Sequence, residues 1–161
     1  MISALRFPVT LFRLLENTAL VTSLITMLVL AIVQIVLRNF FDAGIYWAEP
    51  FLRTLVLWVA LLGAMVATRE SNHINIDAAS RYLSPSARKT AASVVAGVSS
   101  VICGTVAWFS VEFLMFEFED QNIAFASVPT WLTEAIIPFA FTVMAFRFLN
   151  ETITVWTKER P

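Results

Sequence analysis

Four long apolar segments constrain this chain more than any other feature of its sequence. About 20 mostly apolar residues are enough for a helix to cross the hydrocarbon core of a bilayer, and each segment contains a run close to that length or longer. The sequence therefore predicts an all-α membrane protein, built as one four-helix transmembrane domain over residues 1–161. The helices are expected at about 18–37, 51–68, 85–116 and 129–149.

The composition supports a membrane protein and argues against several other classes. Of the 161 residues, 58% are hydrophobic and 14% are charged, whereas soluble domains have about 25% charged residues. A net charge of −1 does not favour a nucleic-acid partner. One cysteine (Cys103) and one histidine (His73) cannot alone form a disulfide, a thiolate metal site or a bis-histidine haem site.

The chain also lacks the usual signatures of an enzyme. No nucleophile–base pair, carboxylate dyad or phosphate-binding glycine loop is visible, and the four glycines are not clustered. The sequence therefore predicts no catalytic residues, no substrate-binding residues, no metal and no cofactor.

Basic residues predict the orientation in the membrane, because loops rich in Lys and Arg stay on the cytoplasmic side. The third loop is acidic and has no base, and the first loop has one base beside two acids. Both termini and the middle loop are therefore expected in the cytoplasm. The basic residues on that side are Arg6, Arg13, Arg69, Arg81, Arg88, Lys89, Lys158 and Arg160.

Several helix ends can be predicted as well. Ser84 and Pro85 suit an N-cap followed by proline in the first helical turn. Asp77 suits the cap of a short surface helix at about 78–82, and the residues before Thr18 suit a second short helix lying in the interface. We expect the first apolar segment to be a retained helix, since its run is too long for a signal peptide. Pro138 predicts a kink in the last helix.

Charged residues inside the apolar segments are candidates for function because they are costly to hold in lipid. Three such residues are Arg53, Glu112 and Glu134, all within about two turns of the outer interface. Glu49 lies one turn before Arg53, in the favourable order for a helical ion pair. We expect these four residues to form a structural ion-pair cluster; a cation or substrate site is the alternative.

Small residues at helical spacing predict packing faces, because they let membrane helices approach closely. The third helix has Ala96, Ser100 and Gly104, and the first has a threonine stripe at residues 18, 22 and 26. Each stripe suits packing inside the bundle or docking of another membrane protein. In the middle loop, Arg69, His73 and Asp77 are candidates for a structural or partner-binding role.

Taken in order, these motifs resemble the small membrane subunit, of the DctQ type, of tripartite ATP-independent periplasmic (TRAP) transporters. The family pattern has a tryptophan, two acids, an arginine, a Gly-Ala pair, and then Arg and His-Ile-x-x-Asp. Here the second acid is replaced by Pro50, which puts any role of that carboxylate in doubt. The matching stretches are Arg38–Phe41, Trp47–Arg53, Leu62–Ala64, Thr68–Asp77, Pro129-x-Trp131, Pro138 and Arg147.

The resemblance implies a partner rather than an activity of the chain itself. In this family a periplasmic binding protein captures an organic acid, and a large membrane subunit (DctM type) moves it across the bacterial inner membrane using a sodium gradient. The small subunit packs against the large one and extends its scaffold. The alternative is a stand-alone four-helix transporter of the multidrug type, but that class has a membrane-embedded glutamate where this chain has Gln34.

Overall fold

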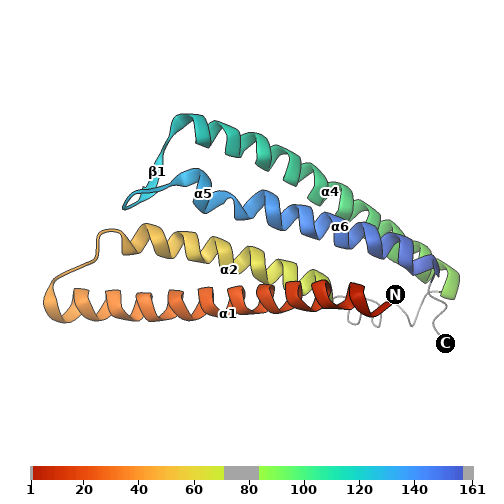
Figure 1. Ribbon diagram of the computed structural model, residues 1–161, viewed down its shortest axis with the longest axis horizontal. Helices are drawn as coiled ribbons and strands as arrows, with labels where there is room; N and C mark the ends of the chain where they lie inside the picture. The colour runs from red at the N-terminus through yellow and green to blue at the C-terminus, as the bar shows by residue number, and fades with distance from the viewer. Residues whose placement is uncertain (1, 71–83, 158–161) are drawn as a thin grey trace. The chain divides into compact units, whose positions relative to one another are not determined.

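The computed structural model describes residues 2–70 and 84–157. In this part of the chain, four helical stretches are long and apolar enough to cross a membrane (Figure 1). The expected architecture of four long apolar helices is therefore confirmed. The helices are α1 (Ile2–Phe41), α2 (Ala48–Glu70), α4 (Pro85–Asp120), and the pair α5 (Thr130–Glu134) and α6 (Ile136–Thr157), which together make the fourth span.

The packing divides the chain into two compact units. The first consists of Met1–Val66 and Leu114–Ile136, and so contains α1, most of α2, the end of α4 and α5. The second consists of Ala67–Phe113 and Ile137–Pro161, and so contains most of α4 and nearly all of α6.

In the first unit, α1 is longer than the sequence analysis predicts. The expectation of a separate short interfacial helix before Thr18 is wrong, because α1 runs without a break from Ile2 to Phe41. The physical reason is that no glycine or proline occurs between Val9 and Phe41, so nothing stops the backbone hydrogen bonds from continuing. The second short helix, expected at about 78–82, lies outside the described residues.

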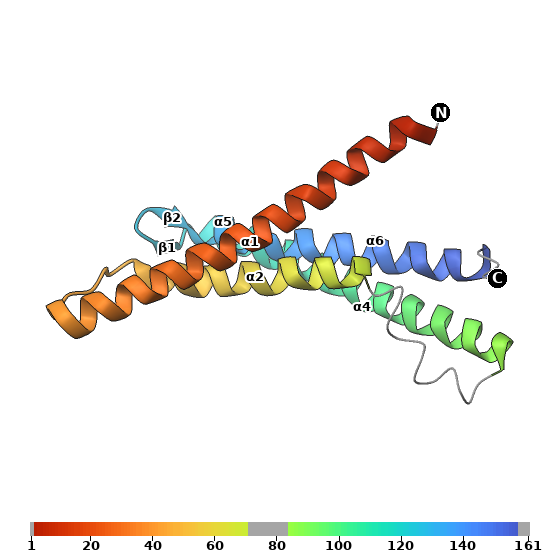
Figure 2. The same ribbon diagram turned by 90° about the horizontal axis from the view of Figure 1, so that it is seen from below.

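The connection between α1 and α2 is tied down by a side chain of α1. Asp42 adopts a left-handed conformation (φ 45°), which ends α1, and the N–H of Ala43 returns to the carbonyl of Leu37. Gln34 then holds the loop with both ends of its amide, because Nε2 donates to the Ile45 carbonyl (3.4 Å) and Oε1 accepts from the Ile45 N–H (3.2 Å). In Figure 2, α1 crosses α2 and diverges from it towards the N-terminus.

A short β-hairpin follows α4, which the sequence analysis does not predict. Strand β1 (Ile123–Phe125) pairs antiparallel with β2 (Val128–Pro129), and Ala126 takes a left-handed conformation in the turn (φ 49°). Two strands alone are marginal, and the ring of Phe125 packs 5.0 Å from that of Phe51 on α2. The hairpin is therefore stabilised by α2.

The last helix, for which the sequence predicts a kink at Pro138, is divided into two helices just before that proline. The helix breaks at Ala135, between α5 and α6. Pro138 lacks the N–H that would bond to the Glu134 carbonyl, and its ring crowds that carbonyl. A break three residues before the proline is the expected result.

In the second unit, α4 and α6 pack through small side chains. The Ser100 hydroxyl donates to the Ala145 carbonyl on α6 (3.0 Å), and a Cβ on Gly97 would lie 3.9 Å from Thr152. At the start of α4, the predicted N-cap is present, since Ser84 Oγ accepts from the Ala87 N–H (3.3 Å). Among the described residues of this unit, the buried side chains are Ala96, Cys103, Ala107, Ala140 and Met144.

Candidate functional site

The most prominent charged feature is the pair Glu49–Arg53 in the first two turns of α2. Arg53 Nη2 lies 2.7 Å from Glu49 Oε1, and the two side chains are 79% and 71% exposed. Pro50 fits because an N–H is not needed in the first helical turn, and Glu49 lies where the helix dipole favours an acid. The helix therefore positions both charges on one exposed face.

The other two members of the predicted charge cluster do not join this pair within the first unit. Glu134 is half-buried on α5, and its Oε2 atom is buried without a hydrogen-bond partner among the described residues. No ion pair joins Glu134 to Arg53 in that part of the chain. Glu112 is exposed on α4, in the second unit.

The middle-loop candidates are described only in part. Arg69 lies in the last turn of α2, where the helix dipole favours a cation. The residue is half-buried and has an interaction partner. His73 and Asp77 lie outside the described residues, so their predicted role stays a prediction.

Sequence reasoning missed one buried acid. Glu16 is only 4% exposed on α1, although the sequence analysis places it in an interfacial helix. A buried carboxylate needs a partner, and Glu16 has one. The signal that could have found it is its position in the candidate span Thr10–Phe41, which forms one uninterrupted helix.

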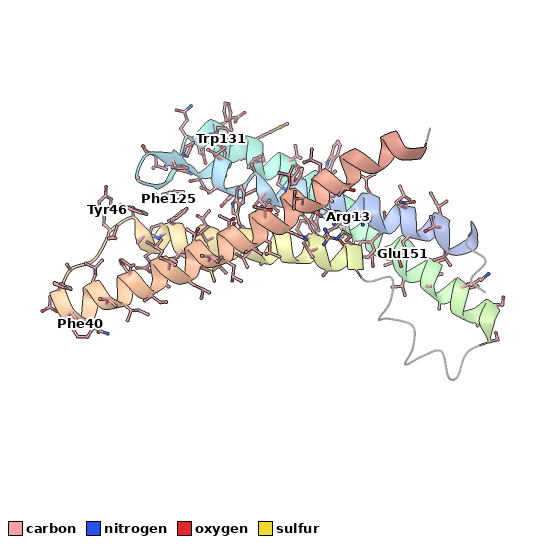
Figure 3. The ribbon with its side chains drawn as sticks, turned by 60° about the horizontal axis from the view of Figure 1, so that its bottom comes forward. Arg13, Phe40, Tyr46, Phe125, Trp131 and Glu151 are labelled. Carbon is pink, nitrogen blue, oxygen red and sulfur yellow. The ribbon has the colours of Figure 1, made fainter. Side chains whose placement is uncertain are left out.

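The hairpin end of the first unit is built from aromatic side chains. The ring of Phe51 lies 6.1 Å from Trp47 and 5.0 Å from Phe125, and Phe118 meets Trp131 edge-on at 5.6 Å. Figure 3 shows Phe125 and Trp131 at the hairpin and α5. Aromatic rings are common where a membrane protein meets the headgroup region, so this end has the composition of an interface.

The second unit carries an open apolar groove of about 370 Å³ between α4 and α6. Its floor contains Ser100 and Gly104 of the predicted small-residue stripe, and no heavy atom lies within 4 Å of a Cβ placed on Gly104. The third stripe residue, Ala96, is buried. No charged side chain lines the groove, so it has no cation to pair with a carboxylate. The lining residues are Ser100, Gly104, Ala107, Trp108, Val111, Thr142, Ala145, Phe146 and Leu149.

Metal binding finds no support in the described part of the chain. Among residues 2–70 and 84–157, no three His, Cys, Asp or Glu side chains are grouped so that they could hold an ion. Cys103 is a free, buried thiol.

Comparison with known families decides the class of the protein. Residues 27–158 match the family described as tripartite ATP-independent periplasmic transporters, DctQ component. The chain belongs to this family. It is therefore an integral membrane component of a transporter and not an enzyme, as the sequence analysis predicts, and membership of a tripartite system implies partners from that system.

Two relatives support the assignment. The chain is 26% identical over 108 residues to the C4-dicarboxylate TRAP transporter small permease protein DctQ of Rhodobacter capsulatus. The aligned region covers 66% of this chain and 48% of that protein. It is 34% identical over 65 residues to a protein of Haemophilus influenzae named as a TRAP transporter small permease protein, covering 40% of each. The chain thus spans about half the length, or less, of the curated relatives it matches.

Proposed function

We propose that this chain is the small membrane subunit of a sodium-driven, binding-protein-dependent TRAP transporter for organic acids in the bacterial inner membrane. In this role it packs against the large membrane subunit and extends its scaffold, while a periplasmic binding protein delivers the substrate. The observation that carries the proposal is the family match over residues 27–158, which covers all four candidate spans in whole or part.

The substrate class is proposed from a relative. The R. capsulatus protein is named for C4-dicarboxylates, which are organic acids with two carboxylates. The α4–α6 groove has no cation to pair with a carboxylate: its polar side-chain groups are the indole N–H of Trp108 and the hydroxyls of Ser100 and Thr142, and Ser100 already donates to Ala145. This supports a substrate path in another subunit.

The orientation belongs to the same proposal. We infer that both termini and the 71–83 segment face the cytoplasm, because the basic residues cluster there, while the β-hairpin and the acidic end of α4 face the periplasm. The acidic residues at that end are Glu117, Glu119 and Asp120.

The alternative of a stand-alone multidrug-type transporter is disfavoured by Gln34. Such a transporter would use a membrane-embedded acid in the first helix to exchange protons for substrate. Gln34 cannot titrate, and both ends of its amide are bonded to Ile45. Its chemistry is therefore structural.

Reconstitution tests the proposal. The chain would be expressed with a large membrane subunit of the same transporter, purified as a complex and placed in liposomes with the binding protein outside. We expect sodium-dependent uptake of a C4-dicarboxylate or another organic acid by the complex, and none by this chain alone. Uptake by the lone chain, or failure of the two proteins to co-purify, would contradict the proposal.

A further inference from the structure

The N-terminal turns of α1 pack differently from the rest of the helix. From Glu16 onward, α1 has buried or half-buried positions at spacings of three and four residues, which define one packing seam along the helix. Between Thr10 and Leu15, by contrast, every residue is exposed. We call the segment Thr10–Leu15 the N-terminal arm of α1. The seam positions include Glu16, Leu20, Ser23, Met27, Leu30, Gln34 and Leu37.

The arm has two faces of opposite character. Leu11, Leu14 and Leu15 lie within about one turn of one another, on the side of the helix away from the packing seam. They are 48%, 62% and 58% exposed. Arg13 is also exposed, but it lies on the side of the helix opposite these leucines. An apolar face backed by a cation is typical of a helix that lies in the headgroup region of a membrane.

The apolar face of the arm is continuous with the lipid-facing side of α1. The same side of the helix carries Val21, Ile25, Val29 and Ile32, and each of them is more than half exposed. These side chains belong to the candidate membrane span, where lipid is the expected surrounding. The continuity of the two surfaces favours lipid, rather than water, as the surrounding of the leucines.

α1 is also too long to fit within the hydrocarbon core. Its candidate span Thr10–Phe41 has 32 residues, which is about 48 Å of helix, whereas the core is about 30 Å thick. A tilt of about 40°, at the upper end of the usual range, would still leave about 37 Å along the membrane normal. The uncharged run Asn17–Leu37 is about 30 Å long and by itself matches the core. The arm, which Glu16 separates from this run, therefore lies beyond the core.

The arrangement of the first unit indicates which way the arm leans. The candidate span of α2, Ala48–Arg69, has 22 residues, or about 33 Å of helix, and so fits the core with little tilt. In Figure 2, α1 crosses α2 and diverges from it towards the N-terminus. The arm therefore leans outward over the neighbouring lipid. This lean turns the side away from the packing seam, with its three leucines, towards the membrane surface.

We propose that the N-terminal arm of α1 lies in the headgroup region of the nearer leaflet and binds anionic lipid there. The three leucines enter the upper part of the acyl chains, and Arg13 pairs with the phosphate of an anionic headgroup. Arg13 has no ion-pair partner among the described residues, and a guanidinium can donate two parallel N–H bonds to a phosphate. The inference goes beyond the proposed function and does not depend on it.

Fluorescence quenching measures the depth of the arm. Leu14→Cys and Arg13→Cys would each be made in a Cys103→Ala background, labelled with bimane and reconstituted as the full chain in liposomes of phosphatidylcholine and phosphatidylglycerol. We expect lipids brominated high on the acyl chain to quench the label at position 14, and iodide in the buffer to quench mainly the label at position 13. Val29→Cys, on the same side in mid-span, is the control and should respond to lipids brominated near the end of the chain.

The outcomes of the depth measurement are separable. Equal quenching by iodide at positions 13 and 14 would show that the arm projects into water, and would overturn the inference. A label at position 14 that neither quencher reaches would also overturn it, because protein then covers the leucines. The measurement would be repeated with the chain assembled with the large subunit. Loss of lipid quenching at position 14 in that complex would make the large subunit the occupant instead of lipid.

The role of Arg13 is tested by the lipid that lies beside the arm. Quenching of the label at position 14 would be compared between brominated phosphatidylglycerol and brominated phosphatidylcholine, each diluted in unbrominated phosphatidylcholine. We expect phosphatidylglycerol to be preferred about fivefold, which corresponds to the roughly 1 kcal/mol that one basic residue contributes near an anionic surface. Arg13→Gln should remove most of this preference.

Arg38→Gln is the matched control for the charge. Arg38 is an exposed arginine in the last turn of the same helix, so its loss should leave the lipid preference at position 14 unchanged. Circular dichroism of each variant reports whether the fold is intact. No preference for phosphatidylglycerol in the unchanged arm, or an equal loss in the Arg13 and Arg38 variants, would overturn the inference.

Discussion

The indole N–H of Trp58 donates a hydrogen bond of 2.9 Å to the main-chain carbonyl of Thr133, which joins α2 to the short helix α5. Thr133 is buried, and it lies two residues before the break at Ala135. A helix broken near a proline has carbonyls without their usual N–H donors, and neighbouring helices commonly satisfy them. Pro138 removes the donor to the Glu134 carbonyl, one residue further on, so the Trp58 bond ties α2 to α5 directly beside the interruption.

Replacing Trp58 by phenylalanine should therefore weaken this contact while keeping most of the ring. We expect Trp58→Phe to lower the free energy of unfolding by about 0.6 kcal/mol, the average for hydrogen bonds between membrane helices, and by no more than about 1.7 kcal/mol. Unfolding in mixed detergent, followed by circular dichroism, would measure it. Trp108→Phe is the control, because Trp108 is 75% exposed on α4; equal losses in both variants would contradict a specific role for the bond.

Gln34 offers a second test of how the first unit is held together. Gln34→Leu removes both hydrogen bonds to Ile45 and leaves a half-buried N–H and carbonyl unpaired, which costs about 1–3 kcal/mol. Gln34→Glu keeps an acceptor for the Ile45 N–H, so its loss should be smaller. The same detergent unfolding experiment would rank the variants. Asn39→Leu removes an amide from an exposed position of the same helix and should change the free energy of unfolding little. If Asn39→Leu lowered it as much as Gln34→Leu does, the two hydrogen bonds of Gln34 to Ile45 would not be important for stability.

The sequence predicts the long elements of this fold well, because each long apolar run leaves the backbone only helix as an outcome in lipid. The Ser84 cap and the break before Pro138 follow from local chemistry and were also predictable. Local sequence patterns cannot show which side chains interact with residues far away in the chain. The bonds from Gln34 to Ile45 and from Trp58 to Thr133 depend on contacts between segments, and the sequence alone gives no sign of them.

In the candidate charge site, too, the local contact was predictable from the sequence and the distant ones were not. Glu49 and Arg53 pair as predicted because the pair is local to one helix turn. Whether Glu134 would join them depends on how α5 packs against α2, and within the described part of the first unit it does not.

The proposed orientation in the membrane can be tested directly. A reporter enzyme that is active only in the periplasm should be active when fused after Asp120, at the end of α4, because no basic residue lies in the loop that follows. The same reporter fused after Arg81 should be silent, since that segment carries the basic cluster. Enzyme activity in whole cells is the measurement, and the reverse pattern would show that the chain is inserted the other way round.

The Glu49–Arg53 pair gives the sharpest prediction about assembly. If a partner helix covers this face, Glu49→Gln should reduce co-purification of the large subunit more than the double change Glu49→Gln with Arg53→Leu, because the single change leaves the arginine charge without its carboxylate. No other described carboxylate lies within ion-pair distance of Arg53 to replace it. The difference should be at least about tenfold, since stranding a desolvated charge costs several kcal/mol.

The measurement is a double-mutant cycle with Glu49→Gln, Arg53→Leu and the pair, scored by the yield of complex and by the apparent substrate affinity of the complex that survives. Loss of complex with unchanged affinity supports a structural role at the interface. Equal, small effects in all three variants would mean that water or headgroups solvate the pair, where an exposed ion pair is worth only about 0–1 kcal/mol. A large loss of affinity with normal yield would instead put Arg53 on the transport path, because only a group that meets the substrate changes affinity without changing assembly.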